Sequence, residues 1–337
     1  MRLDFIRPLY ERHGPYASVY LAGSDVEDRR RRWRSFRDSM EEADRDTLDA
    51  LEEAWGAPAP GRALFAAGGE LVLAESLAEP PPLEQARWSP LPHVTPLLMS
   101  RGENVPHLRV VVDHAGAELT VFGGGSPRVA TVEAQKWPLQ KTAQGGWSQK
   151  VYERAAEETW ERDARVVAHV VDEQVRRIGA ELVVVAGEPA SRSQLCDHLG
   201  TKAADRVMMV EHGSRADHGR FTQDAENALD TWLERRRAEL LDRHRDNAGP
   251  VGFGQVARAL REGRVHAVLS PGELPELMWI GPGGTQLATG ADELRRWGVE
   301  GPVRERADSA LARAAAMTDA ELWFAPEVKE ISAVIRY

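Results

Sequence analysis

The residue types best placed to do chemistry in this chain are gathered in one short segment, residues 141–150. Its sequence is Lys141-Thr142-Ala143-Gln144-Gly145-Gly146-Trp147-Ser148-Gln149-Lys150. Adjacent glycines allow positive φ and let the backbone approach a ligand closely. A long helical pattern follows the segment, and a helix N-terminus presents unpaired backbone N–H groups. The segment therefore predicts a loop that brings backbone donors and amide side chains against a ligand.

No conventional catalytic or metal-binding pattern accompanies this loop. His212 and His218 are the only neighbouring pair of histidines, and no third ligand follows at metal spacing. Ser214 lacks the Gly-x-Ser-x-Gly turn that would expose a nucleophile, and no dinucleotide fingerprint is present. The single Cys196 excludes an internal disulfide framework and any multi-thiolate site made by this chain alone, and we expect it to be a small buried hydrophobe. We therefore expect no metal and no cofactor.

The loop stands between two groups of regular elements. Three short β-rich runs at 108–113, 118–122 and 128–132 precede it and predict an antiparallel meander. One long amphipathic helix is predicted after it, from residue 151 to 178, with Gly179 as its stop. A buried strand at 182–187, a helix at 193–199, a strand at 206–210 and a helix at 221–245 complete the pattern. Residues 101–247 are thus predicted to form a mixed-sheet α/β domain with a Gly-Gly loop and a long helix.

Two further domains are predicted around the central one, which makes the chain an α/β protein of three domains. Residues 1–100 suit a small α+β domain, and the Pro-rich stretch 79–96 suits a connection that crosses the surface. Residues 248–337 alternate helical and strand patterns and suit an α/β/α sandwich.

Composition and charge exclude some classes of protein. The chain has 337 residues, 42% of them hydrophobic and 28% charged, without an apolar run long enough to cross a bilayer. We expect a cytoplasmic protein with no membrane partner. The net charge of −10 argues against binding nucleic acid through bulk positive charge, but residues 101–150 carry six Lys or Arg against four Asp or Glu. That balance suits a tip that enters an anionic site.

The order of meander, Gly-Gly loop, long helix and apolar strand ending in Ala186-Gly187 resembles the central domain of the archaeo-eukaryotic class I release factor and Pelota family. Residues 256–269 are similar to the opening of that family's third domain, and residues 331–337 are similar to its closing strand. The likeness is strongest to the bacterial branch, including the actinobacterial relatives of the ribosome hibernation factor Balon, which open with a strand similar to residues 14–20. The resemblance covers about two thirds of the chain, residues 105–337.

The resemblance implies a role for the loop. Release factors carry Gly-Gly-Gln here, the loop enters the peptidyl-transferase centre, and the Gln residue helps position water and stabilise the developing oxyanion. Gly145 and Gly146 match the two glycines, Trp147 stands in place of the Gln, and Gln149 follows two positions later, as in Vms-type peptidyl-tRNA hydrolases. Two interpretations of Trp147 stay open: its indole stacks on an exposed base, or it packs the loop on its own domain while Gln149 is a helix N-terminal residue.

Three functions follow, from different classes. The resemblance implies a ribosome-binding factor that occupies the A site of idle or stalled bacterial ribosomes, in hibernation or rescue, with rRNA, P-site tRNA and an elongation-factor GTPase as partners. Its contacts to rRNA or tRNA would come from Lys141, Gln144, Trp147, Ser148 and Lys150. Residues 1–100 lack the Asn-Ile-Lys-Ser motif, so stop-codon reading is not expected. The second function is a peptidyl-tRNA hydrolase with Gly145, Gly146 and Gln149 as catalytic residues, and the third is a protein-interaction scaffold. Off the ribosome we expect a monomer.

Overall fold

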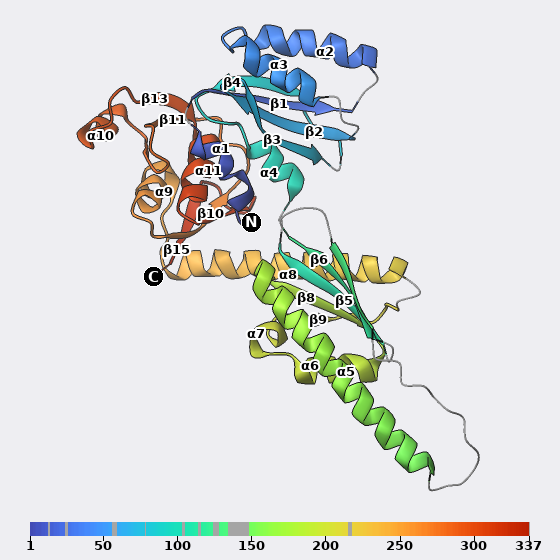
Figure 1. Cartoon of the computed structure of the whole chain (residues 1–337). Helices are drawn as coiled ribbons and strands as arrows, with labels where there is room; N and C mark the ends of the chain where they lie inside the picture. Colours follow the sequence, from blue (N-terminus) through green and yellow to red (C-terminus); the bar gives the residue numbers. More distant parts are fainter. Residues whose placement is uncertain are drawn as a thin grey trace. The chain divides into compact units, whose positions relative to one another are not determined.

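The structure is a computed structural model, and it describes residues 1–12, 14–23, 26–55, 59–77, 79–102, 105–113, 116–123, 128–133, 148–214 and 218–336. It divides into two compact units: unit 1 is Met1–Asn104 with Arg237–Tyr337, and unit 2 is Val105–Arg236. The described residues form four sheets with helices packed on them, which confirms the predicted mixed α/β class (Figure 1).

Unit 2 is built on one five-stranded sheet, in the order β7-β6-β5-β8-β9. Its strands are β5 (His107–Asp113), β6 (Gly116–Phe122), β7 (Arg128–Glu133), β8 (Leu182–Gly187) and β9 (Val207–Met209). The pairs β5–β6 and β6–β7 are antiparallel, whereas β8 runs parallel to both β5 and β9. The meander and the buried strand predicted from the sequence are therefore confirmed.

Helices cover both faces of this sheet. They are α5 (Ser148–Ile178), α6 (Pro189–His198), α7 (Thr201–Ala204) and α8 (His218–Asp246), whose last residues belong to unit 1. On one face, Val183 and Val185 pack with α5 and α6, and on the other, Val184 packs with the first half of α8. Because β8 is buried on both faces, its sequence is a continuous apolar run rather than an alternating one.

The first part of unit 1 is an antiparallel sheet in the order β3-β2-β1-β4. Its strands are β1 (Tyr16–Ala22), β2 (Gly61–Ala67), β3 (Glu70–Leu77) and β4 (Gln85–Ser89). Helices α2 (Val26–Ser39) and α3 (Arg45–Ala54) cover one face of it, where Trp33 and Trp55 pack edge to face (Figure 1). Gly68 and Gly69 join β2 to β3 in a hairpin, since both residues have the positive φ that a tight turn needs.

The Pro-rich stretch 79–96 corrects one expectation. It is not only a surface connection, because it contains β4, which pairs with β1. Leu91 and Val94, which follow β4 within the same stretch, are buried. As an edge strand, β4 tolerates prolines nearby that a central strand would not.

The C-terminal part of unit 1 contains two three-stranded sheets, β14-β10-β15 and β12-β11-β13. Its elements are α9 (Gly252–Arg261), β10 (Val265–Ser270), β11 (Leu277–Ile280), β12 (Leu287–Ala288), α10 (Ala291–Arg296), β13 (Val303–Arg306), α11 (Ala307–Met317), β14 (Glu321–Phe324) and β15 (Ser332–Ile335). Helix α11 lies at the centre of this part, and its side chains from Ala307 to Ala316 are buried. The strands and helices that the sequence predicts between residues 255 and 336 are found here.

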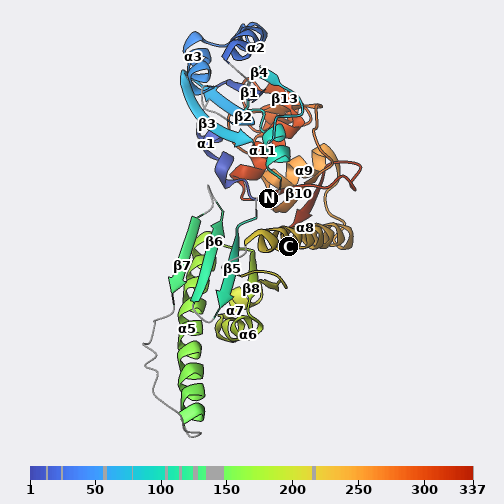
Figure 2. The same cartoon turned by 90° about the vertical axis from the view of Figure 1, so that its right-hand side faces the viewer.

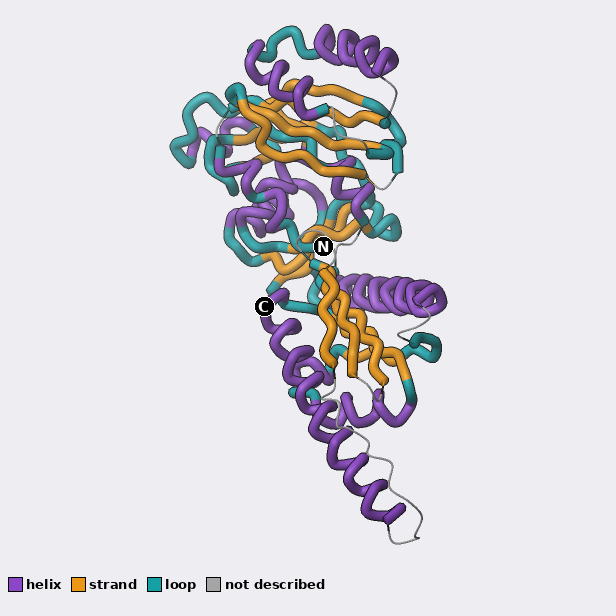
Figure 3. Tube along the Cα trace, turned by 45° about the vertical axis from the view of Figure 1, so that its right-hand side comes forward, coloured by secondary structure: helices purple, strands orange, loops and turns teal. Residues whose placement is uncertain are grey.

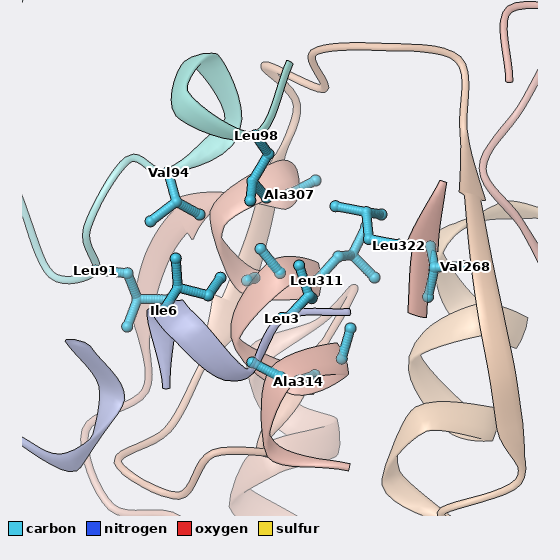
Figure 4. Close-up of a cluster of buried hydrophobic side chains, with 14 of the residues drawn as sticks. Leu3, Ile6, Leu91, Val94, Leu98, Val268, Ala307, Leu311, Ala314 and Leu322 are labelled. Atoms are coloured by element: carbon cyan, nitrogen blue, oxygen red, sulfur yellow. The ribbon is translucent and has the colours of Figure 1, made fainter. Parts of the chain in front are cut away.

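The two ends of the chain share one hydrophobic core in unit 1. The N-terminal elements η1 (Asp4–Ile6) and α1 (Pro8–Glu11), together with α4 (Thr95–Arg101), pack against α11 (Figure 4). Leu3 and Ile6 lie among Leu311 and Leu322 in this core, and the Met1 ammonium donates a hydrogen bond to the carbonyl of Leu322 at 2.6 Å. Residues 1–104 and 237–337 thus form one unit, and the three-domain division at residues 100 and 247 stays a prediction.

Among the described helices, none combines the length and the apolar character that crossing a membrane requires.

The buried hydroxyl of Tyr20 links two segments of unit 1. It donates a hydrogen bond to the carbonyl of His93 at 2.6 Å and accepts one from the N–H of Leu97 at 3.2 Å. Removing it leaves two buried backbone groups without a partner, so we expect Tyr20→Phe to lower the free energy of unfolding of unit 1 by roughly 2 kcal/mol. Urea unfolding measures the difference.

The matched control is Tyr10→Phe. The Tyr10 hydroxyl is also buried, but it has no hydrogen-bond partner in the described part of the chain. Its removal should leave the stability unchanged or raise it. Equal losses in the two variants would contradict the assignment of the Tyr20 hydrogen bonds.

Candidate functional site

The predicted loop falls largely outside the described residues. Lys141, Gln144, Gly145, Gly146 and Trp147 lie in the undescribed segment 134–147. The three other predicted site residues, Ser148, Gln149 and Lys150, are the first three residues of α5, which begins three positions earlier than the sequence predicts.

These three residues therefore occupy the first turn of a helix. The first four backbone N–H groups of an α-helix have no partner within it, and the helix dipole places partial positive charge at this end. Gln149 is thus a helix N-terminal residue, with backbone donors of the same turn beside it. Such a turn suits an anion or a carbonyl oxygen as ligand.

Helix α5 carries this turn away from the body of unit 2. It has 31 residues and is about 46 Å long, whereas a seven-residue strand such as β5 spans about 23 Å. Its C-terminal half packs on the sheet through Val167, Val171 and Val175, while its N-terminal half extends past the ends of the strands (Figures 2 and 3). We call residues 148–160 the arm. Ser148 lies about 28 Å along the helix axis from Val167, the first of these three valines.

The C-terminal half of α5 is anchored at two places. Asp172 accepts hydrogen bonds from the N–H of Gly200 at 3.0 and 3.2 Å, which ties α5 to the start of α7. Ile178 lies against Gly123, which follows the last residue of β6. Helix α5 therefore ends beside the end of the sheet that is opposite the arm. These contacts fix the direction of the helix within unit 2.

The root of the arm lies beside the carboxyl ends of β5 and β8. A cavity of about 20 Å³ lies there between Asp113, Asp163 and Ser191, large enough for a single water molecule. Strands β5 and β8 approach each other closely at their carboxyl ends: a Cβ on Gly187 would lie 1.8 Å from the backbone oxygen of Val112. Only glycine fits this position, which gives a physical reason for the Ala186-Gly187 strand end noted in the sequence.

At the opposite end of the sheet, where β5 begins and β6 ends, two rings and a guanidinium pack together. The His107 ring stacks on Phe122 at 4.4 Å, and the Arg109 guanidinium lies 4.5 Å from the centre of the same Phe122 ring. Burial lowers the pKa of His107 to about 4, so its ring is neutral at physiological pH. Its Nδ1 lies 2.9 Å from the carbonyl of Val105, which is the geometry of a structural hydrogen bond.

The isolated polar residues singled out in the sequence are not brought together. His212 lies 3.1 Å from the carboxylate of Asp224 on the surface, and no group of three metal-ligating side chains occurs within the described ranges. Cys196 is only half-buried, which corrects the expectation of a buried hydrophobe, and burial still raises the pKa of its thiol.

Comparison with known proteins gives a match to a family model and matches to two proteins. Residues 106–250 match the model of bacterial archaeo-eukaryotic release factor family 2. Uncharacterized proteins Rv2629 and MT2704 of two Mycobacterium tuberculosis strains are each 31% identical to this chain, over 96% of its length and 92% of theirs. The chain belongs to the bacterial branch of the archaeo-eukaryotic release factor family. The matched range contains all of α5 and every described strand of unit 2.

Solved structures of this superfamily are more distant. They include an archaeal translation termination factor (14% identity, TM-score 0.26, 98% of this chain and 96% of that chain) and ribosome-bound archaeal Pelota (14%, 0.37, 99% and 94%). Saccharomyces cerevisiae Dom34, a translation termination-like factor, is 8% identical with a TM-score of 0.39, over 82% of this chain and 81% of that one. Membership of the release factor family therefore rests on the sequence matches.

The close approach at Gly187 is testable. We expect Gly187→Ala to destabilise unit 2 by roughly 3 kcal/mol or more, because the new methyl group meets a backbone oxygen that cannot move without shifting β5. Hydrogen-exchange mass spectrometry reports the stability of each unit separately.

Gly14→Ala is the control. Gly14 has a φ of 131°, close to the 124° of Gly187, but a Cβ there would have no atom within 4 Å. That variant introduces only backbone strain, so we expect it to lower the free energy of unfolding of unit 1 by roughly 1 kcal/mol. A loss at Gly187 no larger than the loss at Gly14 would show that the two strands do not approach as described.

Proposed function

We propose that this protein is a ribosome-binding translation factor that occupies the A site of idle or stalled bacterial ribosomes, in hibernation or rescue. The arm is the observation that carries the proposal: a release-factor-family domain presents the helix turn that follows Gly145 and Gly146 at the end of a projecting helix. A single helix is about 10 Å wide, narrow enough to enter a cavity lined by RNA.

The charge of the segment supports the same role. Residues 134–150 contain Lys136, Lys141 and Lys150 and no acidic residue, on a chain whose net charge is −10. A segment with lysines and no acidic residue binds phosphates locally, while the acidic remainder of the chain resists non-specific binding to RNA. In this proposal Lys141, Gln144, Trp147, Ser148 and Lys150 contact rRNA or P-site tRNA.

The remaining parts of the proposal follow from the family. Unit 1 lacks the Asn-Ile-Lys-Ser motif of stop-codon readers, so the factor binds without codon specificity. The C-terminal part of the chain would meet the ribosomal stalk base or an elongation-factor GTPase. The protein would act in the cytoplasm and be a monomer off the ribosome.

A second function, peptidyl-tRNA hydrolysis, is favoured by the position of Gln149. Gln149 belongs to the first turn of α5, whose backbone N–H groups have no partner within the helix and are the kind of donors that stabilise an oxyanion. Hydrolysis would then use Gly145, Gly146 and Gln149, in spite of Trp147 standing where the family has its Gln.

One experiment tests both functions. Bacterial ribosomes carrying peptidyl-tRNA in the P site are mixed with the protein, and sedimentation and ester cleavage are followed in the same tube. We expect the unaltered protein to co-sediment, and Lys141→Gln/Lys150→Gln to bind roughly 10-fold more weakly with a salt dependence of log K reduced by about 2.

The matched double variant is Lys202→Gln/Lys329→Gln, which removes two exposed lysines away from the loop and should bind unchanged. Failure of the unaltered protein to co-sediment, or equal weakening by both double variants, would contradict the A-site proposal. Cleavage that falls roughly 100-fold in Gln149→Ala, but not in Gln223→Ala on α8, would establish the hydrolase.

A further inference from the structure

A pocket of about 500 Å³ opens within unit 1, and the proposed function does not use it. Tyr10 and Tyr16 line it from the start of the chain, and Ile280, Gly281 and Arg313 line it from the C-terminal part. Its volume lies in the range of small-molecule sites, and leucine, isoleucine, valine and proline side chains supply much of its wall.

Three of its lining residues carry a buried polar atom without a hydrogen-bond partner in the described part of the chain. These atoms are the hydroxyls of Tyr10 and Tyr16 and the Nε of Arg313. Burial raises the pKa of Tyr10 and raises that of Tyr16 to about 12, so both phenols keep a proton to donate at neutral pH. An unsatisfied buried donor is destabilising, and three of them beside one pocket point to a missing acceptor.

The charge of Arg313 defines that acceptor. Its side chain is buried, and its terminal nitrogens donate to the carbonyls of Gly281 at 3.0 Å and Gln286 at 3.1 Å. Within the described ranges it makes no ion pair with a carboxylate. Burial lowers the pKa of the guanidinium, as expected of a cation taken out of water without a counter-ion.

The nearby carboxylate of Glu305 raises the pKa of Arg313 but makes no ion pair with it among the described residues. Its oxygens already accept hydrogen bonds from the N–H of Leu91 at 2.9 Å and of Arg306 at 2.7 Å. Burial raises the pKa of Glu305, and the same two backbone hydrogen bonds lower it. A bound anion would complete the electrostatics that Glu305 leaves incomplete.

We propose that this pocket binds a small organic monoanion, a carboxylate on an apolar body, with the carboxylate accepting from Arg313, Tyr10 and Tyr16. The apolar body would lie along Leu91, Ile280 and Val303. A doubly charged phosphate fits less well, because Glu300 lines the pocket and Glu305 lies near Arg313. The three donors are shielded from solvent, so we expect the inner wall to adjust slightly as the carboxylate enters.

The test uses the full chain without ribosomes, so that its outcome is independent of the proposed function. Benzoate, phenylacetate and hexanoate are titrated by calorimetry and by nuclear magnetic resonance, beside methyl phenylacetate and inorganic phosphate. We expect at least one carboxylate to bind saturably below about 20 mM, with the ester and phosphate at least 10-fold weaker. Tyr10→Phe and Tyr16→Phe should each weaken the carboxylate roughly 5- to 10-fold, as expected for one lost hydrogen bond.

Tyr20→Phe is the matched control, because it removes a buried phenol hydroxyl of the same unit that does not line the pocket. It should leave carboxylate affinity unchanged. The proposal is overturned if none of the three carboxylates binds, if the ester binds equally well, or if neither Tyr10→Phe nor Tyr16→Phe weakens binding. The two pocket variants delete only hydroxyls without a partner among the described residues, so both are expected to fold.

Discussion

Packing of the C-terminal half of α5 on the sheet of unit 2 determines the direction in which its N-terminal half runs. Val167, Val171 and Val175 lie one turn apart and are buried against β5, β6 and β8. A helix is far stiffer than a loop, so the fixed half sets the course of the arm. The position of Ser148 and Gln149 therefore depends on apolar contacts that begin about five turns away from them.

The sheet itself depends on close packing at the root of the arm. Gly187 lets β8 end against Val112, and the N–H of Glu188 then donates to the carbonyl of Val112 at 3.2 Å. A larger residue at position 187 would part the two strands that carry α5. The absence of a side chain at Gly187 and the packing of three valines thus determine where the first turn of α5 lies.

Unit 1 shows a different use of the chain. Its first residues complete the core around α11, with Leu3 and Ile6 next to Leu311 and the N-terminal ammonium on Leu322. The same junction brings Tyr10 and Tyr16 near Arg313 and forms the pocket between them. The proposed anion site is therefore a product of the two chain ends folding together.

Much of unit 2 could be predicted from the sequence, because its signals are local. The 31-residue helix has a sustained apolar period, β8 is a continuous apolar run, and glycines separate β5, β6 and β7. Unit 1 is harder to predict from the sequence, because the contacts that form its core join residues about 300 positions apart. No local pattern predicts that Leu3 packs near Leu311, or that Arg313 makes no ion pair with any described carboxylate. Strand β4 was missed because the prolines around it are typical of a connection, although they are also compatible with a sheet edge.

In the proposed function, the arm enters the peptidyl-transferase centre of the ribosome. Directed hydroxyl-radical probing tests it most directly, because the native chain has only one cysteine, Cys196, to remove. An iron chelate is attached at Ser148→Cys, in a Cys196→Ser background, and cleavage of the large-subunit rRNA is mapped on bound ribosomes. We expect cleavage around the peptidyl-transferase centre from Ser148→Cys and none there from Lys202→Cys on the body of unit 2. Bound protein whose Ser148→Cys probe cleaves elsewhere, or not at all, would contradict it.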